Sequence, residues 1–330
     1  MTDRKASTSP ALKKVIYVMI IGVMLYGAVA VWRGIDKFGA VLSAFHGSAF
    51  LFACGLAFGN YICRFFKWEF YLARLGIRGV PKWESFLIFL SGFVLTVTPG
   101  KVGEVFKSAV LEERYGVPLP KTAPIVVAER ITDVLGIVVL IALGSTAFSG
   151  GLVWAGIGTG LVVVLLVVIM SRRLSLGIID LVAKLPKLGG IAPKLRTSYE
   201  NLTVLVLPKN LLVPTVISLF AWLLECLALY EILQGFGATV PVGPCLFIYA
   251  TSTLAGAIVP VPGGLGITEG TMLNELTSLA RVEDNIAAAA MMLVRFATLW
   301  FAVLVGFISL SILKARPLPA ESATQDTSPT

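Results

Sequence analysis

Three charged side chains lie together in an otherwise uncharged stretch of the chain. Glu129, Arg130 and Asp133 fall within residues 122–148, which contain no other Asp, Glu, Lys or Arg. Residues three and four apart share a helix face, so we expect these side chains near one face. A charge at the centre of a membrane helix costs about 2.5–3.5 kcal/mol, so the trio must face charged partners or a water-filled cavity. The spacing predicts either a site for a polar ligand or a neutral cluster that only orients helices.

A fourth charge of this kind, Arg295, has no acidic residue within one helical turn. The nearest preceding acids, Glu283 and Asp284, are at least eleven residues back in the chain. A buried arginine needs a hydrogen-bonded partner, which must therefore come from another element. Glu269 and Glu225 are the candidates.

Two glycine-rich segments interrupt the chain before these arginines, at residues 99–103 and 262–266. We call them the first and the second break, and each joins an apolar segment to the predicted start of a helix. Proline ends the incoming helix, and glycine lets the backbone turn sharply and approach another surface closely. The N–H groups at the new helix start favour a phosphate or a carboxylate. Lys101 adds a positive charge in the first break, where Gly264 stands in the second. We predict substrate binding by the breaks and the charged residues near them: Pro99, Gly100, Lys101, Gly103, Glu104, Glu129, Arg130, Asp133, Pro262, Gly263, Gly264, Gly266, Glu269 and Arg295.

The two breaks belong to a longer repeated pattern. Each copy has a glutamate near the end of an apolar run, then Val-Pro, an apolar approach and Pro-Gly-x-x-Gly followed by a glutamate. An arginine follows the Pro of this motif by 31 residues in the first copy and 33 in the second. We predict repeats at about 48–148 and 211–312. Inverted repeats whose broken helices meet near the bilayer midplane are the layout of many secondary transporters.

The composition makes the bilayer the solvent for much of the chain. Of the 330 residues, 57% are apolar and 14% are charged, and the mean hydropathy is +0.88. Soluble domains are about 45–50% apolar and about 25% charged, which excludes a soluble nucleotide-binding or nucleic-acid-binding domain as the main body. The single histidine, His46, and four cysteines without C-x-x-C spacing predict no metal site. We expect no cofactor.

The apolar runs predict an all-α polytopic membrane protein. A span needs about 20 residues, and six runs qualify, at about 15–32, 48–68, 122–148, 152–170, 211–234 and 284–312. Two further stretches, 83–98 and 244–261, end at the breaks and are predicted to be re-entrant helical hairpins. With both termini in the cytoplasm, 21 of the 27 Lys and Arg residues lie on the cytoplasmic side, including those at 64–82 and 107–121.

The segments outside the spans have simpler interpretations. We predict a cytoplasmic N-terminal tail at 1–14, a single transmembrane domain at 15–313 and a disordered cytoplasmic tail at 314–330. The first apolar run is interpreted as an uncleaved span, although its basic start and small residues at 28–30 also permit a signal peptide. The connection at 171–210 is either a set of amphipathic helices on the cytoplasmic leaflet or a solvated linker.

Four motifs, in chain order, resemble those of a known family. TPGKVGE at 98–104, VAERITD at 127–133, PVPGGLGITEG at 260–270 and LVR at 293–295 are similar to the flippase-like transmembrane region of the lysylphosphatidylglycerol synthetase family. This family includes UPF0104-type proteins and a hopanoid-biosynthesis-associated membrane protein. The resemblance covers roughly residues 10–315. It implies an integral protein of the bacterial cytoplasmic membrane that moves an anionic or aminoacylated phospholipid between leaflets.

The expected function is therefore lipid transport, with a membrane lipid as substrate and no nucleic-acid partner. A short tail follows the last apolar run, so we expect neither the family's soluble aminoacyl-transferring domain nor its enzyme activity. The sequence has no GxxxxGK[ST] loop for ATP, whereas a proton on a buried carboxylate could couple transport. Two alternatives remain: a transferase at the membrane interface with Glu104 or Asp133 as general base, and a non-transporting accessory protein of lipid biosynthesis.

Overall fold

The computed structural model describes residues 41–98, 102–146, 151–184, 190, 192–259 and 261–318, and these residues form helices joined by turns. The all-α fold class is confirmed for this part of the chain. The predictions for residues 1–40, which include the N-terminal tail and the first span, lie outside the described residues. So do those for Pro99, Gly100 and Lys101 and for residues 319–330.

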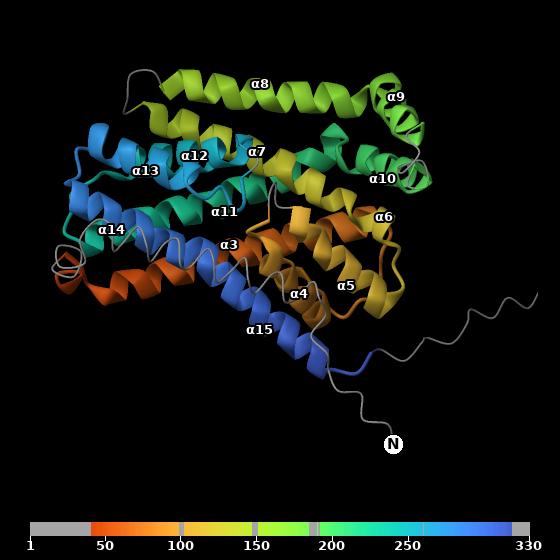
Figure 1. Cartoon of the computed structure of the whole chain (residues 1–330), viewed down its shortest axis with the longest axis horizontal. Helices are drawn as coiled ribbons and strands as arrows, with labels where there is room; N and C mark the ends of the chain where they lie inside the picture. The colour runs from red at the N-terminus through yellow and green to blue at the C-terminus, as the bar shows by residue number, and fades with distance from the viewer. Residues whose placement is uncertain are drawn as a thin grey trace, which may run out of the picture.

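Figure 1 shows the helices along the long axis of the molecule. In the first half they are α3 (Gly47–Arg74), α4 (Lys82–Ser91), η1 (Gly92–Leu95), η2 (Val102–Val105), α5 (Phe106–Tyr115), α6 (Leu119–Thr122), α7 (Pro124–Ser145) and α8 (Gly151–Met170). They continue as α9 (Arg172–Ala183), α10 (Ala192–Leu205), α11 (Pro208–Gly235), α12 (Val242–Ile258), α13 (Ile267–Ser278), α14 (Asp284–Arg295), the π-helical turn η4 (Phe296–Trp300) and α15 (Phe301–Ala315).

Three of the described helical segments are long and apolar enough to cross a bilayer. They are α3, α11 and the continuous helix at 284–315 formed by α14, η4 and α15. The 22-residue α7 carries the charged trio in its first half, and the 20-residue α8 has no charged residue. The predicted spans at 122–148 and 152–170 therefore correspond to helices, whereas the number of crossings stays a prediction.

The helices α3 and α11 pack against each other in opposite directions. The backbone N–H of His46, just before α3, donates to the carbonyl of Gly235 at the end of α11, with an N···O distance of 3.0 Å. The neighbouring rings of Phe45 and Phe236 have centroids 4.6 Å apart. The start of one helix therefore lies beside the end of the other.

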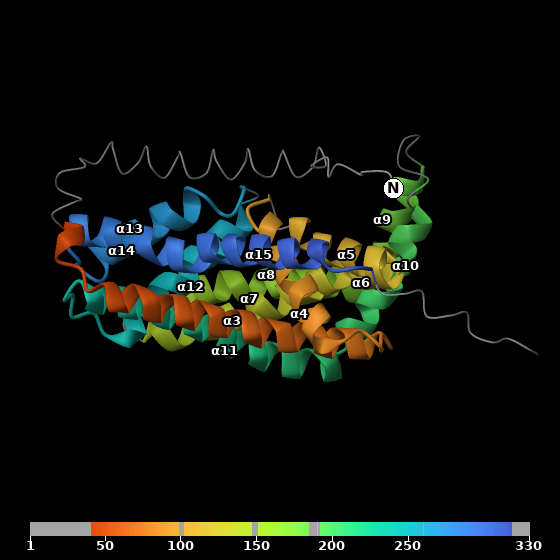
Figure 2. The ribbon, with the colours of Figure 1, turned by 90° about the horizontal axis from the view of Figure 1, so that it is seen from below.

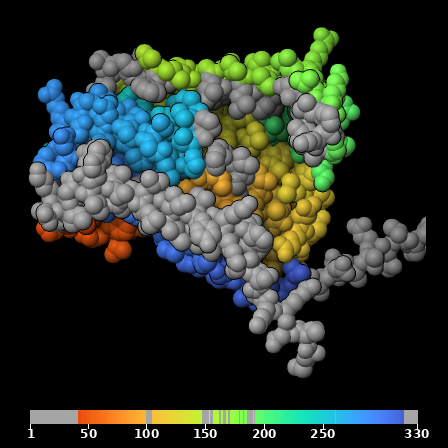
Figure 3. Space-filling view, in the orientation of Figure 1, coloured from red at the N-terminus to blue at the C-terminus, as the bar shows by residue number. Residues whose placement is uncertain are grey.

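Each predicted re-entrant stretch forms two helical arms with a break between them. In the first hairpin, α4 and η1 approach the break, and η2 and α5 leave it; in the second, α12 approaches and α13 leaves. Figure 1 and the view from below in Figure 2 place α13 and α14 at one end of the long axis and α5 and α6 towards the other. The space-filling view in Figure 3 shows the same separation on one face of the molecule.

The connection between the halves is helical and packed. It contains α9 and α10, and Tyr199, Leu202 and Leu205 of α10 are buried. The hydroxyl of Ser198 donates to the carbonyl of Pro120 at 3.0 Å. The connection is therefore helical where the structure describes it, with α10 packed against the rest of the protein, whereas its position on the cytoplasmic leaflet stays a prediction.

The last helix ends slightly later than the sequence predicts. Because α15 continues to Ala315, the first two residues of the expected disordered tail are helical. The guanidinium of Arg114 holds this end, donating to the carbonyls of Leu313 at 3.1 Å and Pro317 at 3.0 Å.

Three basic residues that the charge count places in cytoplasmic loops are buried between helices. Arg64, Lys67 and Lys107 are only 6%, 0% and 2% exposed. They pair with carboxylates inside the protein, so they cannot set orientation as solvated loop charges do.

Candidate functional site

A cavity of about 140 Å³ lies between the two breaks. Thr96 and Thr98 line it from the first break, and Val261 and Gly263 line it from the second. A methyl group placed on Gly263 would lie 3.1 Å from Cγ1 and 3.5 Å from Cα of Val97, so the second break packs against the arm that leads into the first break. Segments that are more than 160 residues apart in the sequence therefore form one wall.

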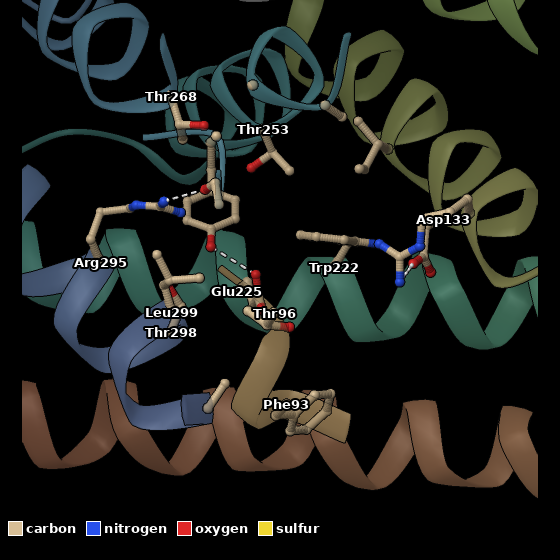
Figure 4. Close-up of a pocket in the computed structure, with 18 of the residues that line it drawn as sticks. Phe93, Thr96, Asp133, Trp222, Glu225, Thr253, Thr268, Arg295, Thr298 and Leu299 are labelled. Carbon is tan, nitrogen blue, oxygen red and sulfur yellow. Dashed lines mark hydrogen bonds and ion pairs between the residues drawn. The ribbon is translucent and has the colours of Figure 1, made fainter. Parts of the chain in front are cut away.

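Five charged side chains line this cavity: Arg64, Arg130, Asp133, Glu225 and Arg295. Figure 4 shows Arg295 and Asp133 on opposite sides, with Glu225 between them. The hydroxyl of Tyr249 donates to Oε2 of Glu225 at 2.7 Å. Threonine hydroxyls and aromatic rings supply much of the remaining lining, so the site can accept a ligand with both polar and apolar parts.

Glu104 holds the arginines on the first side of the cavity. It lies in η2, directly after the first break, and is 1% exposed. Its Oε2 is 3.3 Å from an Nη2 of Arg64 on α3 and 3.0 Å from an Nη2 of Arg130 on α7. The hydroxyl of Thr96, on the other arm of the hairpin, lies 3.4 Å from Oε1. One carboxylate thus connects both arms of the break to two neighbouring helices.

Asp133 forms a second charged junction, one helical turn from Arg130. Its Oδ2 lies 3.2 Å from the guanidinium of Arg130, and its Oδ1 accepts from the ammonium of Lys67 and, at 3.0 Å, from the hydroxyl of Ser218. Lys67 also donates to the hydroxyl of Ser218 at 2.8 Å. Since these residues come from α3, α7 and α11, the cluster fixes three long helices to one another.

Arg295 contacts both the backbone of the second break and the glutamate that follows it. Its Nε lies 2.6 Å from Oε1 of Glu269, and an Nη2 donates to the carbonyl of Gly263 at 2.9 Å. The other oxygen of Glu269 accepts the N–H of Gly266 at 2.6 Å. The break needs glycine, because φ is +61°, +69° and +85° at Gly263, Gly264 and Gly266. The predicted partner Glu269 is confirmed, and it already takes the N–H of Gly266 that the sequence had suggested for a ligand.

The helix changes its winding directly after Arg295. Residues Phe296–Trp300 form a π-helical turn, a rare feature that is frequent at functional sites. Thr298 and Leu299 of this turn line the cavity, and the carbonyl of Thr298 accepts the hydroxyl of Tyr61 at 2.8 Å. The wider turn therefore belongs to the cavity wall.

The side chain of Glu129 does not line the cavity. Its carboxylate oxygens lie 2.7 and 2.8 Å from the ammonium of Lys107, which stacks 4.7 Å from the ring centre of Trp68. Neither member of this pair lines the cavity. Adjacent helix residues are about 100° apart, so Glu129 cannot share the direction of Arg130 even though it is four residues from Asp133.

The structure thus brings most, but not all, predicted site residues to one place. Arg130, Asp133, Gly263, Gly264 and Arg295 line the cavity. Glu104 and Glu269 stand directly behind the arginines that they hold. Pro262 and Gly266 belong to the second break without lining the cavity, and Gly103 lies in η2.

Sequence reasoning missed Arg64, Lys67 and Lys107. Arg64 and Lys67 lie near the end of an apolar run, and Lys107 lies in the charged stretch after the first break, where basic residues normally serve as loop charges. One signal was available. Three predicted intramembrane acids in the first half, Glu104, Glu129 and Asp133, outnumbered the predicted intramembrane cations, Lys101 and Arg130, so buried neutrality required a further cation. Among the described residues, no group of three or more His, Cys, Asp or Glu is placed to hold a metal ion.

The sequence matches the family described as the lysylphosphatidylglycerol synthase TM region over residues 19–306. The chain belongs to this family. The chain is also similar to proteins described as UPF0104 membrane proteins of Methanothermobacter thermautotrophicus, in two matches with 30% and 31% identity over 111 and 102 residues. These matches cover 34% and 31% of this chain and 31% and 30% of the relatives, about a third of their length.

A longer match confirms the relationship. A UPF0104 membrane protein of Methanocaldococcus jannaschii is 23% identical over 230 residues, which cover 68% of this chain and 96% of the relative. Both breaks and the residues that line the cavity lie inside the range that the family matches. The resemblance seen in the sequence motifs is therefore confirmed, and the chain is an integral membrane protein.

Proposed function

We propose that this protein moves a lipid with a polar headgroup between the leaflets of the cytoplasmic membrane. The cargo is an anionic or modified phospholipid, or another polar lipid, and the protein acts as a transporter and not as an enzyme. In this proposal six helices cross the bilayer, including residues 15–32. The hairpins α4–α5 and α12–α13 are re-entrant, the halves form an inverted repeat, and both termini lie in the cytoplasm.

The position of Arg130 is the observation that carries the proposal. Its side chain is 25% exposed and lines the cavity, whereas Glu104 and Asp133, which hold it, are almost completely buried. A guanidinium presents five N–H donors in a planar fork that fits a phosphate. A headgroup phosphate can therefore bind at Arg130 in competition with the two carboxylates.

The ion pairs suggest how binding is linked to movement. In the empty cavity Glu104 forms ion pairs with Arg64 and Arg130, and Glu269 forms one with Arg295. Both glutamates directly follow a break, so a phosphate that takes over an arginine also releases one hairpin. A ligand can shift a conformational equilibrium only by binding one state better, and this exchange of partners supplies such a difference.

The agreement between the two halves supports the inverted repeat. In each half, the glutamate after the break pairs with the arginine of the next long helix: Glu104 with Arg130 at 3.0 Å and Glu269 with Arg295 at 2.6 Å. The sequence of elements is also the same, with a 28-residue helix, a helix that starts after proline, a break, a short helix and a long helix.

Lipid movement in proteoliposomes tests the proposal. Vesicles carry fluorescent phosphatidylglycerol or phosphatidylcholine, and dithionite added outside quenches only the label in the outer leaflet. We expect the wild type to expose the inner-leaflet label, and Arg130→Ala and Arg295→Ala to slow this about tenfold, the loss expected from a charge-assisted hydrogen bond. Arg196→Ala, on the exposed surface of α10, is the matched control.

Two outcomes would overturn the proposal. Wild-type rates in both cavity variants would refute the assignment of the site to the headgroup. Chemical modification of the lipid without movement would favour the transferase at the membrane interface.

A further inference from the structure

Glu275 is a buried carboxyl group that the proposed headgroup site does not use. It lies on α13 and is 5% exposed. Among the residues that the structure describes, no Lys, Arg or His forms an ion pair with it. The other buried acid on α13, Glu269, pairs with Arg295. An ionised carboxylate buried without a cation is so costly that the group normally takes up a proton.

The hydrogen bonds around Thr251 are compatible with a proton on Glu275. Its hydroxyl oxygen is 2.6 Å from Oε2 of Glu275 and 2.7 Å from the carbonyl oxygen of Phe247, one turn earlier on α12. A hydroxyl has one hydrogen, so it cannot donate fully to two acceptors at such short distances. Both bonds form if Thr251 donates to Phe247 and a protonated Glu275 donates to Thr251.

The groups around Glu275 leave it isolated from other charges. The helix α12 has no charged residue, and its titratable groups are Cys245 and Tyr249. The helix α14 carries Asp284 and Arg295 at its two ends, with Arg295 engaged by Glu269. The exposed Arg281 and Glu283 lie in the turn between α13 and α14.

We propose that Glu275 is a proton-binding site that couples the second hairpin to a proton gradient. The bound proton joins the two arms, because its hydrogen bond runs from α13 to Thr251 on α12. When the carboxyl O–H bond breaks and the proton passes to water, a carboxylate without a cation remains between the arms, and the cost of burying its charge favours a state in which the arms separate and water reaches it. Since α13 also carries Glu269, this motion is transmitted to Arg295 in the cavity.

The location supplies a short path to water. Glu275 lies one turn before α13 ends at Ser278, and α13 and α14 meet at one end of the molecule (Figure 1). In the proposed topology this end faces outwards. Protons therefore reach Glu275 from the outer side, the acidic side of an energised membrane.

Infrared difference spectroscopy tests the bound proton directly and without any transport assay. We expect the wild type in nanodiscs to show the carbonyl band of a protonated carboxylic acid at neutral pH, and to lose it as pH rises. Glu275→Gln removes this band, whereas Glu283→Gln, which changes an exposed carboxylate at the same end, keeps it. Thr251→Val shifts the band because the hydrogen bond is lost. An unchanged band in Glu275→Gln would overturn the proposal.

The thermal unfolding temperature gives a second readout. Glutamine resembles the neutral acid and can donate to Thr251, so Glu275→Gln should unfold at the wild-type temperature. A large decrease would instead mean that the native group is ionised.

The coupling rests on the proposed function and has its own test. In proteoliposomes with an acidic exterior at the α13 end, we expect faster lipid movement than without a gradient, and Glu275→Gln should lose this difference. Wild-type movement that ignores the gradient would refute the coupling. If the wild type moves no lipid at all, the proposed function fails, while the infrared result still decides whether Glu275 binds a proton.

Discussion

The side-chain amide of Asn60 donates to the carbonyl of Ala221 at 2.8 Å, and the two residues occupy equivalent places in their helices. Each lies 13 residues after the start of a 28-residue helix, at Gly47 of α3 and Pro208 of α11. Since these helices run in opposite directions, they cross at corresponding midpoints. A two-fold axis through this crossing would exchange the halves, which supports the inverted repeat.

Glu104→Gln is expected to have opposite effects on stability and on ligand binding. The empty protein should unfold at a lower temperature, because Arg64 and Arg130 lose the carboxylate that neutralises them. A short-chain anionic phospholipid should then stabilise the variant more than the wild type, since the phosphate no longer competes with Glu104. Thermal unfolding in detergent, with and without the lipid, measures both effects. Equal lipid stabilisation in both proteins would contradict the competition.

The Lys107–Glu129 pair should show strong coupling in a double-mutant cycle. Lys107→Met or Glu129→Gln alone leaves a buried charge unpaired and should destabilise the protein by about 3–5 kcal/mol. The double variant removes both charges and should recover much of this loss. Unfolding temperatures of the four proteins give the comparison. Additive losses would show that the two groups do not depend on each other.

Arg295→Lys should loosen the second break while keeping its charge. Arg295 uses two different nitrogens of its planar guanidinium to contact Glu269 and the carbonyl of Gly263. The single ammonium group of lysine cannot reproduce this geometry. We expect faster hydrogen exchange in peptides covering residues 261–270, because backbone hydrogen bonds there open more often. Arg130→Lys, in the first half, serves as the control and should leave these peptides unchanged.

Gly306→Ala should displace α15 from the first hairpin. The added methyl group would lie 2.7 Å from the backbone N of Val94 and 2.9 Å from the carbonyl O of Leu90, where neither backbone atom can move easily. Overpacking of this kind costs about 1–3 kcal/mol and should lower the unfolding temperature. Gly160→Ala on α8 meets no atom within 4 Å and should be neutral or slightly stabilising. Similar effects of both substitutions would contradict the predicted contact.

The second break was the most predictable part of the site. Its glycines were expected from their spacing, and positive φ angles explain why glycine is needed. The absence of a local acid near Arg295 pointed to a partner on another element, either Glu269 or Glu225, and Glu269 is the one that pairs with it. The cavity itself could not be predicted, because it depends on the distance between two breaks that are far apart in the chain.

Helix contacts were harder to predict from glycine patterns. Gly156 and Gly160 have G-x-x-x-G spacing, yet a methyl group on either would meet open space. Gly136, Gly144 and Gly306 have no such spacing, but each would place a methyl group within 3.0 Å of another helix or hairpin. Close approach depends on where two helices cross, and a single helix's sequence does not contain that information.

The buried cations of α3 also constrain how the protein is made. Arg64 pairs with a residue 40 positions later, and Lys67 with one 66 positions later. Ribosomes deliver α3 to the membrane before either acid has been synthesised, and each unpaired charge costs about 2.5–3.5 kcal/mol at the centre of the bilayer. The helix must therefore keep these side chains at the aqueous boundary until α7 arrives. We therefore expect a nascent chain stopped before Asp133 to leave α3 in a different position.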